Sequence, residues 1–201
     1  GDLRILIQAP QPGGASIAAR LRRLDENAQI TMLERGRDVS FSNCSLPYFL
    51  SREVEDAEWL KLVDPPTFHD RYRITALTRH EALRINRADK TVLVRDLNTG
   101  EDRVLPYDTL FLSPGAMPIM PSALPGIRLP HVFSVRNVED VERIDRYLKA
   151  HGVTKVAIIG GGFIGVEVME NLVEAGIRVS LIDLAPQVML PFDEDMAQFL
   201  H

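Results

Sequence analysis

The chain has 201 residues, and its 23 basic and 28 acidic side chains give a formal net charge of −5 at pH 7. A protein that binds nucleic acid along a groove is normally basic, so this balance disfavours that class. A single cysteine is too few for an intrachain disulfide framework, and no apolar run is long enough to span a bilayer. The histidines show no metal-ligand spacing, and the N-terminal residues lack the layout of a secretory signal. We therefore expect a cytoplasmic protein that binds no metal, no nucleic acid and no membrane.

The first quarter of the chain has the pattern of a strand, a glycine turn, a helix and a second strand. An apolar run at residues 3–7 is followed by the turn, and apolar positions at helical spacing then cover 15–24. A second apolar run at 30–33 completes the pattern. This order predicts a βαβ unit with parallel strands and a right-handed crossover.

The turn of this first unit has one feature of a nucleotide site and lacks another. Glu34 comes twenty residues after Gly14, a spacing that suits an acidic side chain on a nucleotide ribose. Only the end of a glycine-rich loop is present, at Gly13 and Gly14, and Pro10 and Pro12 have no N–H to offer a phosphate. The unit is therefore either a nucleotide site or a βαβ unit that has lost its ligand.

The middle of the chain changes to a different pattern. Residues 91–96 and 103–105, separated by turn residues, predict an antiparallel hairpin. An apolar strand at 109–112 leads into a proline-rich connection that extends to residue 130. A helix with one apolar face is predicted over 138–150, and the asparagine directly before it is the expected N-cap.

A second strand–turn–helix–strand pattern covers 156–182, with its helix at 163–175. Only residues 184–201 follow, whereas a doubly wound domain needs several more strands to bury both faces of its sheet. The predicted fold class is α/β, with two Rossmann-like, three-layer βαβ units, the second incomplete, and an antiparallel hairpin in the first domain. We place the domains at 1–117 and 118–201 and interpret the chain as the N-terminal part of a longer protein.

The second turn carries a dinucleotide fingerprint. Gly160, Gly162 and Gly165 match G-x-G-x-x-G between a strand and a helix. The first glycine permits the tight turn, the second lets a pyrophosphate approach the backbone, and the third lets helix and strand pack closely. Asp183, twenty-one residues after Gly162, ends the next strand, where its carboxylate suits a ribose 2′-hydroxyl. No arginine follows at 184–186 to bind a 2′-phosphate, so NADH is expected to be favoured over NADPH.

Two further features are candidates for chemistry. Cys44 lies within Ser-Phe-Ser-Asn-Cys-Ser-Leu-Pro-Tyr, residues 40–48. A single cysteine is most often a packing residue, but small polar neighbours in place of an apolar stripe favour a reactive thiol. Arg20 and Arg23 lie one helical turn apart on the first helix and are either phosphate ligands or part of a solvated face.

Together these motifs resemble the single-cysteine branch of the flavin-dependent pyridine nucleotide–disulfide oxidoreductases, in particular coenzyme A disulfide reductases and persulfide or polysulfide reductases. The similarity extends over nearly the whole chain and is carried by GGASIAARLRRL, SFSNCSLPY, YDTLFLSPGAMP and VAIIGGGFIGVEVMENL. The resemblance implies an NAD(P)H-dependent flavoprotein enzyme with FAD in the first domain and NAD(P)H in the second. It also implies a homodimer in the intact protein and a small disulfide or persulfide, derived from coenzyme A, as substrate.

The resemblance also assigns residue roles. It makes Cys44 the redox-active catalytic residue, which passes electrons from the flavin to the substrate sulfur. The residues implied to bind substrate are Ser16, Arg20, Arg23, Ser40 and Asn43. Those implied to bind FAD are Gly13, Gly14, Glu34, Ser113 and Gly115, and those implied to bind the nicotinamide dinucleotide are Gly160, Gly162, Gly165 and Asp183. Tyr72 stands where the family often has a basic residue, so one phosphate contact of the substrate is not carried over.

A second hypothesis comes from a different functional class. The prolines of the first turn and the absence of the family's later half also fit a non-catalytic nucleotide-binding or interaction fragment that has lost flavin binding. Under the first hypothesis, too, we expect the 201-residue chain to be inactive alone and to hold FAD weakly. Flavin absorption of the purified protein distinguishes the two hypotheses.

Overall fold

The structure is a computed structural model that describes residues 3–8 and 13–200. Its contacts divide the chain into two compact units. The first unit comprises Gly1–Phe41 and Lys61–Met117, and the second comprises Ser42–Leu60 and Pro118–His201. The chain therefore passes between the units after residue 117 and also at both ends of residues 42–60, and each unit is described by itself below.

The first unit contains the predicted βαβ pattern within a four-stranded parallel sheet. Its helices are α1 (Gly13–Leu24) and α3 (Pro65–Tyr72), and its parallel strands are β1 (Arg4–Gln8), β2 (Gln29–Leu33), β3 (Ile74–Leu77) and β7 (Thr109–Leu112). The strand order is β3-β2-β1-β7, and every pair is parallel. The parallel βαβ unit predicted from the sequence is thus confirmed, while β3 and α3 were not predicted.

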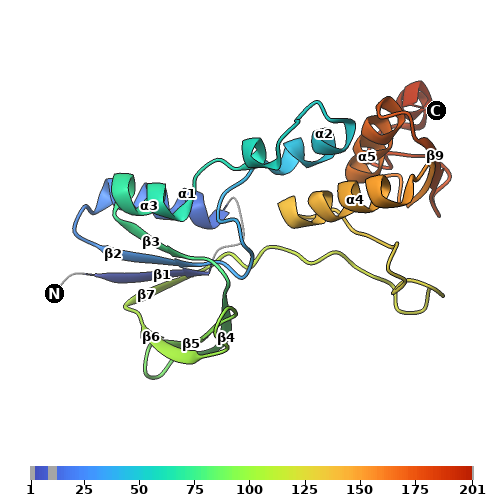
Figure 1. The fold of residues 1–201 in the computed structure, drawn as a ribbon. Coiled ribbons are helices and arrows are strands. Elements are labelled where there is room, and N and C mark those ends of the chain that lie inside the picture. Colours follow the sequence, from blue (N-terminus) through green and yellow to red (C-terminus); the bar gives the residue numbers. More distant parts are fainter. Residues whose placement is uncertain (1–2, 9–12, 201) are drawn as a thin grey trace. The chain divides into compact units, whose positions relative to one another are not determined.

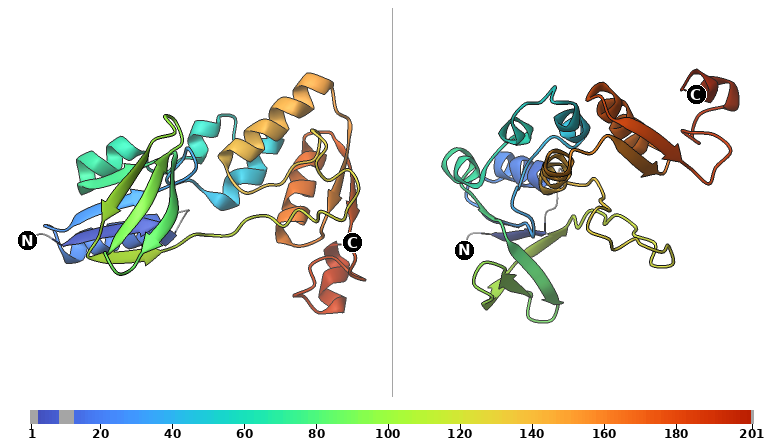
Figure 2. Two further views of the ribbon diagram at one scale, coloured as in Figure 1. Left: turned by 90° about the horizontal axis from the view of Figure 1, so that it is seen from below. Right: turned by 45° about the vertical axis from the view of Figure 1, so that its right-hand side comes forward.

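Both faces of this sheet are covered. Figures 1 and 2 show α1 and α3 on one face and a second, antiparallel sheet on the other. Ile5 and Ile7 of β1 pack in the cluster that includes Ala18 of α1 and Phe68 of α3. Leu6, between them in the sequence, packs with the strand residues of the antiparallel sheet. The alternation of β1 therefore produces the three layers expected of this fold class.

The antiparallel sheet consists of β4 (His80–Asn86), β5 (Thr91–Asp96) and β6 (Asp102–Pro106), in the order β4-β5-β6. The predicted hairpin corresponds to β5 and β6. Strand β4 was missed because its sequence, HEALRIN, carries charges at Glu81 and Arg84 and its register shifts between Ala82 and Arg84. A bulge of this kind disturbs the two-residue alternation by which a strand is predicted.

The second unit is built around a short parallel sheet and three helices. The sheet pairs β8 (Lys155–Ile159) with β9 (Arg178–Ile182), and α5 (Phe163–Glu174) connects them. Two further helices, α2 (Leu46–Ser51) and α4 (Val138–His151), pack together, and α2 also packs against α5 (Figure 1). Shorter elements are η1 (Asn43–Ser45), η2 (Ala57–Leu60), α6 (Glu194–Ala197) and η3 (Gln198–Leu200).

Helix α4 begins as the sequence predicts. The Asn137 side chain accepts a hydrogen bond from the N–H of Asp140 at 2.9 Å, and the Asp140 carboxylate accepts one from the N–H of Arg136 at 3.0 Å. This reciprocal capping satisfies two N–H groups at the helix start. Among the helices that the structure describes, none is long and apolar enough to cross a membrane.

An ion pair joins the start of β1 to the turn before β7. The Arg4 guanidinium donates to both carboxylate oxygens of Asp108, at 3.1 and 2.9 Å, and lowers the pKa of Asp108 to about 2. The pKa of an aspartate in an unfolded chain is about 3.9. This pair therefore stabilises the fold above that pH, and its contribution is lost as the pH falls toward 2. We expect the midpoint of urea unfolding to decline between pH 4 and pH 2, and to decline less in Asp108→Asn. An equal decline in both proteins would contradict this assignment.

Candidate functional site

The carboxyl edge of the first parallel sheet gathers three of the predicted flavin-binding residues. Glu34 directly follows β2 and Ser113 directly follows β7, and the two strands lie on either side of β1. Gly13 begins α1, and a Cβ atom on it would lie 2.5 Å from the hydroxyl oxygen of Ser113. A side chain at position 13 would require the Ser113 hydroxyl to turn aside, so glycine lets the start of α1 lie close to Ser113. Ligands of open α/β sheets bind at this edge of the strands, so the location suits a nucleotide.

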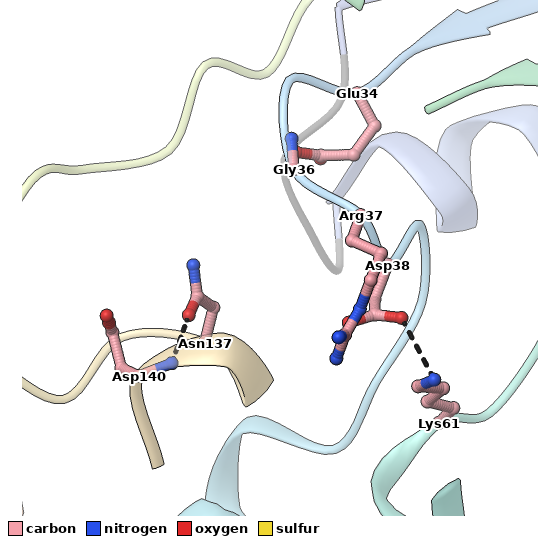
Figure 3. Close-up of polar contacts among 7 residues, drawn as sticks. All are labelled: Glu34, Gly36, Arg37, Asp38, Lys61, Asn137 and Asp140. Atoms are coloured by element: carbon pink, nitrogen blue, oxygen red, sulfur yellow. Dashed lines mark hydrogen bonds and ion pairs between the residues drawn. The ribbon is translucent and has the colours of Figure 1, made fainter. Parts of the chain in front are cut away.

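Glu34 has a fixed direction in this site. Its side chain is buried, and its Oε1 atom accepts a hydrogen bond from the N–H of Gly36 at 2.6 Å (Figure 3). Its backbone is held on both sides, since its N–H donates to Leu77 and its carbonyl accepts from His80, each at 2.9 Å. A Cβ at position 36 would come within 3.0 Å of the carboxylate, so glycine also suits this position. The sequence analysis missed Gly36, although it follows the acid by two residues.

Two further residues, Gly14 and Gly115, are candidates for binding the flavin. Gly14 is buried in the first turn of α1, and Gly115 is exposed with a φ of +66°, a left-handed conformation that favours glycine. The prolines that make the first turn unusual, Pro10 and Pro12, lie outside the described residues. The residues that are described around this edge fit a nucleotide with a ribose.

Helix α1 separates its arginines into two kinds. Ser16, Arg20 and Arg23 are exposed and share one face of the helix. Arg22 is half-buried and donates to four backbone carbonyls, those of Asp25, Glu26, Tyr72 and Arg73, at 2.7 to 3.1 Å. Burial lowers the pKa of Arg22, helped by the nearby charge of Arg73. Arg22 therefore joins the end of α1 to the end of α3, a role that sequence analysis did not assign.

This difference predicts different mutational effects along one helix. Arg22→Ala removes four charge-assisted hydrogen bonds that join the ends of α1 and α3, so we expect the free energy of unfolding to fall by about 2 kcal/mol. Arg20→Ala and Arg23→Ala remove exposed side chains and are expected to change it by no more than about 0.5 kcal/mol. Urea unfolding of the three variants measures this. Similar losses in all three would contradict the structural role of Arg22.

The glycines of the second turn have distinct geometries. Gly160 has a φ of +108°, which L-residues with a side chain rarely adopt. A Cβ on Gly165 would collide with the carbonyl oxygen of Gly160, whereas a Cβ on Gly162 would meet no atom within 4 Å. Gly162 is the N-cap of α5, where free N–H groups and the helix dipole favour an anion. The turn thus combines a tight bend, close helix–strand packing and open space at the helix start.

Asp183 lies directly after β9 and faces this turn. Its Oδ2 atom accepts a hydrogen bond from the N–H of Gly161, and its Oδ1 atom accepts one from the N–H of Ala185 at 2.7 Å. These backbone hydrogen bonds lower the pKa of Asp183, so the carboxylate stays ionised at neutral pH. A carboxylate has about four acceptor positions, so this one has capacity for a ribose hydroxyl as well.

Cys44 is exposed and unpaired in η1, just before α2. Its exposure contradicts the alternative that it packs in the core. Ser42 and Ser45, which flank Cys44 in the sequence, form a hydrogen bond between their hydroxyl groups at 2.7 Å. Asn43 is also exposed and lies with Cys44 in the second unit. Ser40 belongs to the first unit. The predicted site residues therefore occur in both units, with Cys44, Asn43 and the dinucleotide turn in the second.

Comparisons with known proteins agree on the kind of protein this is. A family model described as pyridine nucleotide-disulphide oxidoreductase matches residues 11–201. The chain is 40% identical over 195 residues to coenzyme A disulfide reductase of Staphylococcus aureus (strain JH9), covering 97% of this chain and 44% of that protein. The chain therefore spans less than half the length of this relative.

Solved structures show the same similarity. The structure of reduced CoADR-RHD from Bacillus anthracis superposes with a TM-score of 0.95 at 42% identity, over 99% of this chain and 36% of that one. An NAD-dependent persulfide reductase from A. fulgidus superposes with a TM-score of 0.93 at 31% identity, over 98% of this chain and 37% of that one.

Proposed function

Because the chain belongs to the pyridine nucleotide–disulphide oxidoreductase family, we propose that its protein is an FAD-dependent NAD(P)H:disulfide oxidoreductase that reduces coenzyme A disulfide, persulfide or polysulfide through Cys44. The observation that carries this proposal is the exposure of Cys44, which is the only cysteine of the chain. The similarity to a coenzyme A disulfide reductase over 97% of the chain supports the substrate class.

Each unit would hold one cofactor. FAD, when bound, accepts a hydride from the nicotinamide and passes an electron pair to sulfur. In the first unit, the residues proposed to hold FAD are Gly13, Gly14, Glu34, Ser113 and Gly115. In the second unit, those proposed to hold the nicotinamide dinucleotide are Gly160, Gly162, Gly165 and Asp183. The carboxylates would bind ribose hydroxyls, and the start of α5 would bind the pyrophosphate.

The sulfur chemistry belongs to Cys44. Its thiolate attacks one sulfur of coenzyme A disulfide, the substrate S–S bond breaks, and one coenzyme A leaves as a thiolate with the bonding electron pair. The second coenzyme A stays bound to Cys44 as a mixed disulfide. Two electrons from NADH, together with protons from solvent, then release the second thiol and regenerate Cys44. The overall reaction consumes NADH, one proton and the disulfide, and yields NAD⁺ and two coenzyme A thiols.

Substrate recognition is proposed for the exposed face of α1 and for the residues beside Cys44. Arg20 and Arg23 carry guanidinium groups that match phosphate oxygens, and Ser16 on the same face offers a hydroxyl. Ser40 and Asn43 are the proposed contacts near the reacting sulfur. The positive charges would attract the phosphates of coenzyme A and leave neutral disulfides unaffected.

A mixed-disulfide assay on this chain tests the proposal without any cofactor. The protein is incubated with coenzyme A disulfide or with bis(2-hydroxyethyl) disulfide, and mass spectrometry follows the addition of one thiol to the single cysteine. Each rate is first divided by the intrinsic reactivity of that disulfide toward a free thiol. On this corrected scale we expect coenzyme A disulfide to react at least about tenfold faster than the neutral disulfide, because arginines concentrate an anionic substrate. The double variant Arg20→Ala/Arg23→Ala should lose this preference. An equal rate for both disulfides in the unaltered chain would contradict the proposal and favour a non-catalytic module.

The geometry of Asp183 further supports a preference for NADH. A carboxylate accepts the 2′-hydroxyl of NADH but repels the 2′-phosphate of NADPH, and no arginine follows at 184–186. We expect NADH to bind at least about tenfold more tightly, which corresponds to about 1.4 kcal/mol. Titration followed by the fluorescence of the reduced nicotinamide measures both affinities. Asp183→Ala should bring the two affinities together, and tighter binding of NADPH by the unaltered protein would refute the assignment.

A further inference from the structure

The segment that carries Cys44 leaves the first unit and returns to it at one short pairing of backbone. This Cys44 segment comprises residues 42–60, and the pairing, called the crossing here, joins 40–42 to 60–62. An antiparallel bridge pairs Phe41 with Lys61. The N–H of Ser42 donates to the carbonyl of Leu60 at 2.8 Å, and the N–H of Leu62 donates to the carbonyl of Ser40 at 2.9 Å. Both ends of the Cys44 segment are thus defined by two hydrogen bonds.

A shielded ion pair lies at the crossing. The Lys61 ammonium is 3.4 Å from the Asp38 carboxylate, and their side chains are only 23% and 11% exposed. Figure 3 shows the Asp38 carboxylate directed toward Lys61. Arg37 contributes a second cation, with its Nε atom 3.2 Å from the same carboxylate. Charges that have lost most of their hydration depend on their partners, so removing one partner is costly.

The crossing needs this pair because it is too short to define its own register. A single bridge with two hydrogen bonds is far below the size at which paired strands are stable by themselves. A slip of one residue would turn the buried Phe41 away from the core and shift the following chain by about 3.3 Å. Cys44 lies three residues after Phe41, so the slip would displace its sulfur. Displacements of about 1 Å are enough to slow reactions that depend on alignment.

We propose that the Asp38–Lys61 ion pair positions the Cys44 thiol by fixing the register of the crossing. Lys61 and Asp38 are separated by 23 positions in the sequence, and both would act on the thiol through the backbone of the crossing, so their role is positioning. The inference deepens the proposed function and rests on it for the identity of the substrate. It assigns to two charged residues a specific effect on sulfur chemistry, beyond their contribution to stability.

Two measurements on the 201-residue chain test this role. The first is hydrogen exchange of the Ser42 and Leu62 amides, which report the crossing directly. The second is the rate of mixed-disulfide formation between Cys44 and coenzyme A disulfide, divided by its rate of alkylation by iodoacetamide. Iodoacetamide is small and needs only an exposed thiol. A change in the exposure or in the thiolate fraction of Cys44 alters both rates alike and cancels in the ratio. The ratio therefore reports the position of the thiol.

The variants are Asp38→Asn and Lys61→Met, with Lys61→Arg as the conservative rescue and Asp108→Asn as a matched control. Asp108 also forms an ion pair in the first unit, with Arg4 at the opposite, amino end of β1. We expect both disruptive variants to exchange the two amides at least about tenfold faster and to lower the ratio about tenfold. Lys61→Arg and Asp108→Asn should leave both values within about twofold of the unaltered chain. Should either single variant fail to fold, Asp38→Asn/Lys61→Met removes both charges together and should show the same two changes.

Three outcomes would overturn the inference. Unchanged exchange in the disruptive variants would mean that the pair does not hold the crossing. Faster exchange with an unchanged ratio would make the pair structural only. An equally lowered ratio in Asp108→Asn would show a general effect of losing any ion pair. If the unaltered chain shows no preference for coenzyme A disulfide over a neutral disulfide, the proposed function fails, and amide exchange still decides whether Asp38 and Lys61 hold the crossing.

Discussion

Replacing Cys44 by serine is expected to abolish the addition of coenzyme A to the chain. Serine keeps nearly the same shape and retains hydrogen bonding, but its oxygen is a far poorer nucleophile near neutral pH and forms no mixed disulfide. Cys44 is exposed, so the substitution buries no new polar group and should leave the fold intact. Mass spectrometry after incubation with coenzyme A disulfide gives the result directly, because the chain has no other cysteine.

The control for this variant is binding of NADH, which we assign to the dinucleotide turn and not to the sulfur. NADH affinity should stay within about twofold of the unaltered chain, since effects at independent sites are close to additive. In an intact enzyme, the same separation predicts loss of disulfide reduction with electron transfer from NADH to a dye retained. A parallel loss of NADH binding and of thiol reactivity would instead indicate a general loss of structure, and Cys44 would have no specific catalytic role.

Replacing either of two glycines of the dinucleotide turn by alanine is expected to affect a different property, stability at Gly165 and NADH binding at Gly162. In Gly165→Ala the new methyl group meets the backbone carbonyl of Gly160, which cannot move without shifting β8 or α5. Overpacking of this kind costs about 1 to 3 kcal/mol, and we expect the upper part of that range because the obstacle is backbone. Urea unfolding of the variant measures the loss.

Gly162→Ala is the matched comparison. Its Cβ meets no atom within 4 Å and its φ is −79°, so the new side chain is not strained. Alanine is a poorer N-cap than glycine, so we expect the free energy of unfolding to fall by no more than about 1 kcal/mol. The new methyl group would occupy the space through which a pyrophosphate approaches the helix start, and NADH binding should weaken at least about tenfold. If Gly162→Ala bound NADH normally, the open space at this position would not be the pyrophosphate site.

Several parts of the fold follow from local patterns. The apolar runs and the glycine turns predicted β1, α1 and β2 in the first unit, and β8, α5 and β9 in the second, with small differences at the ends. Asn137 was identified as the N-cap of α4 because capping depends on neighbours three residues apart. The spacing of Glu34 and Asp183 from their glycine turns predicted acids at the ends of two strands, and both are found there.

Other parts could not be predicted from local patterns. Strand β3, edge strand β4, and helices α2 and α3 are short and depend on what packs against them. Helix α2 has only six residues, and an isolated helix of that length is not stable in water. Its apolar residues form a short run without a clear helical period. Helices α4 and α5 provide the surface that stabilises it.

The sequence by itself therefore determined the α/β class, the two glycine turns with their acids and the single cysteine proposed as the nucleophile, because each of these depends on residues close together in the chain or on residue type alone. Only the tertiary structure decided which arginine of α1 is structural, since Arg22 differs from Arg20 and Arg23 through carbonyls that lie about fifty residues away. The tertiary structure likewise brought Lys61 to Asp38 and set the crossing at the base of the Cys44 segment. Such pairings have no local signal, because the energy that selects them comes from burial and from charges that meet only after the chain has folded.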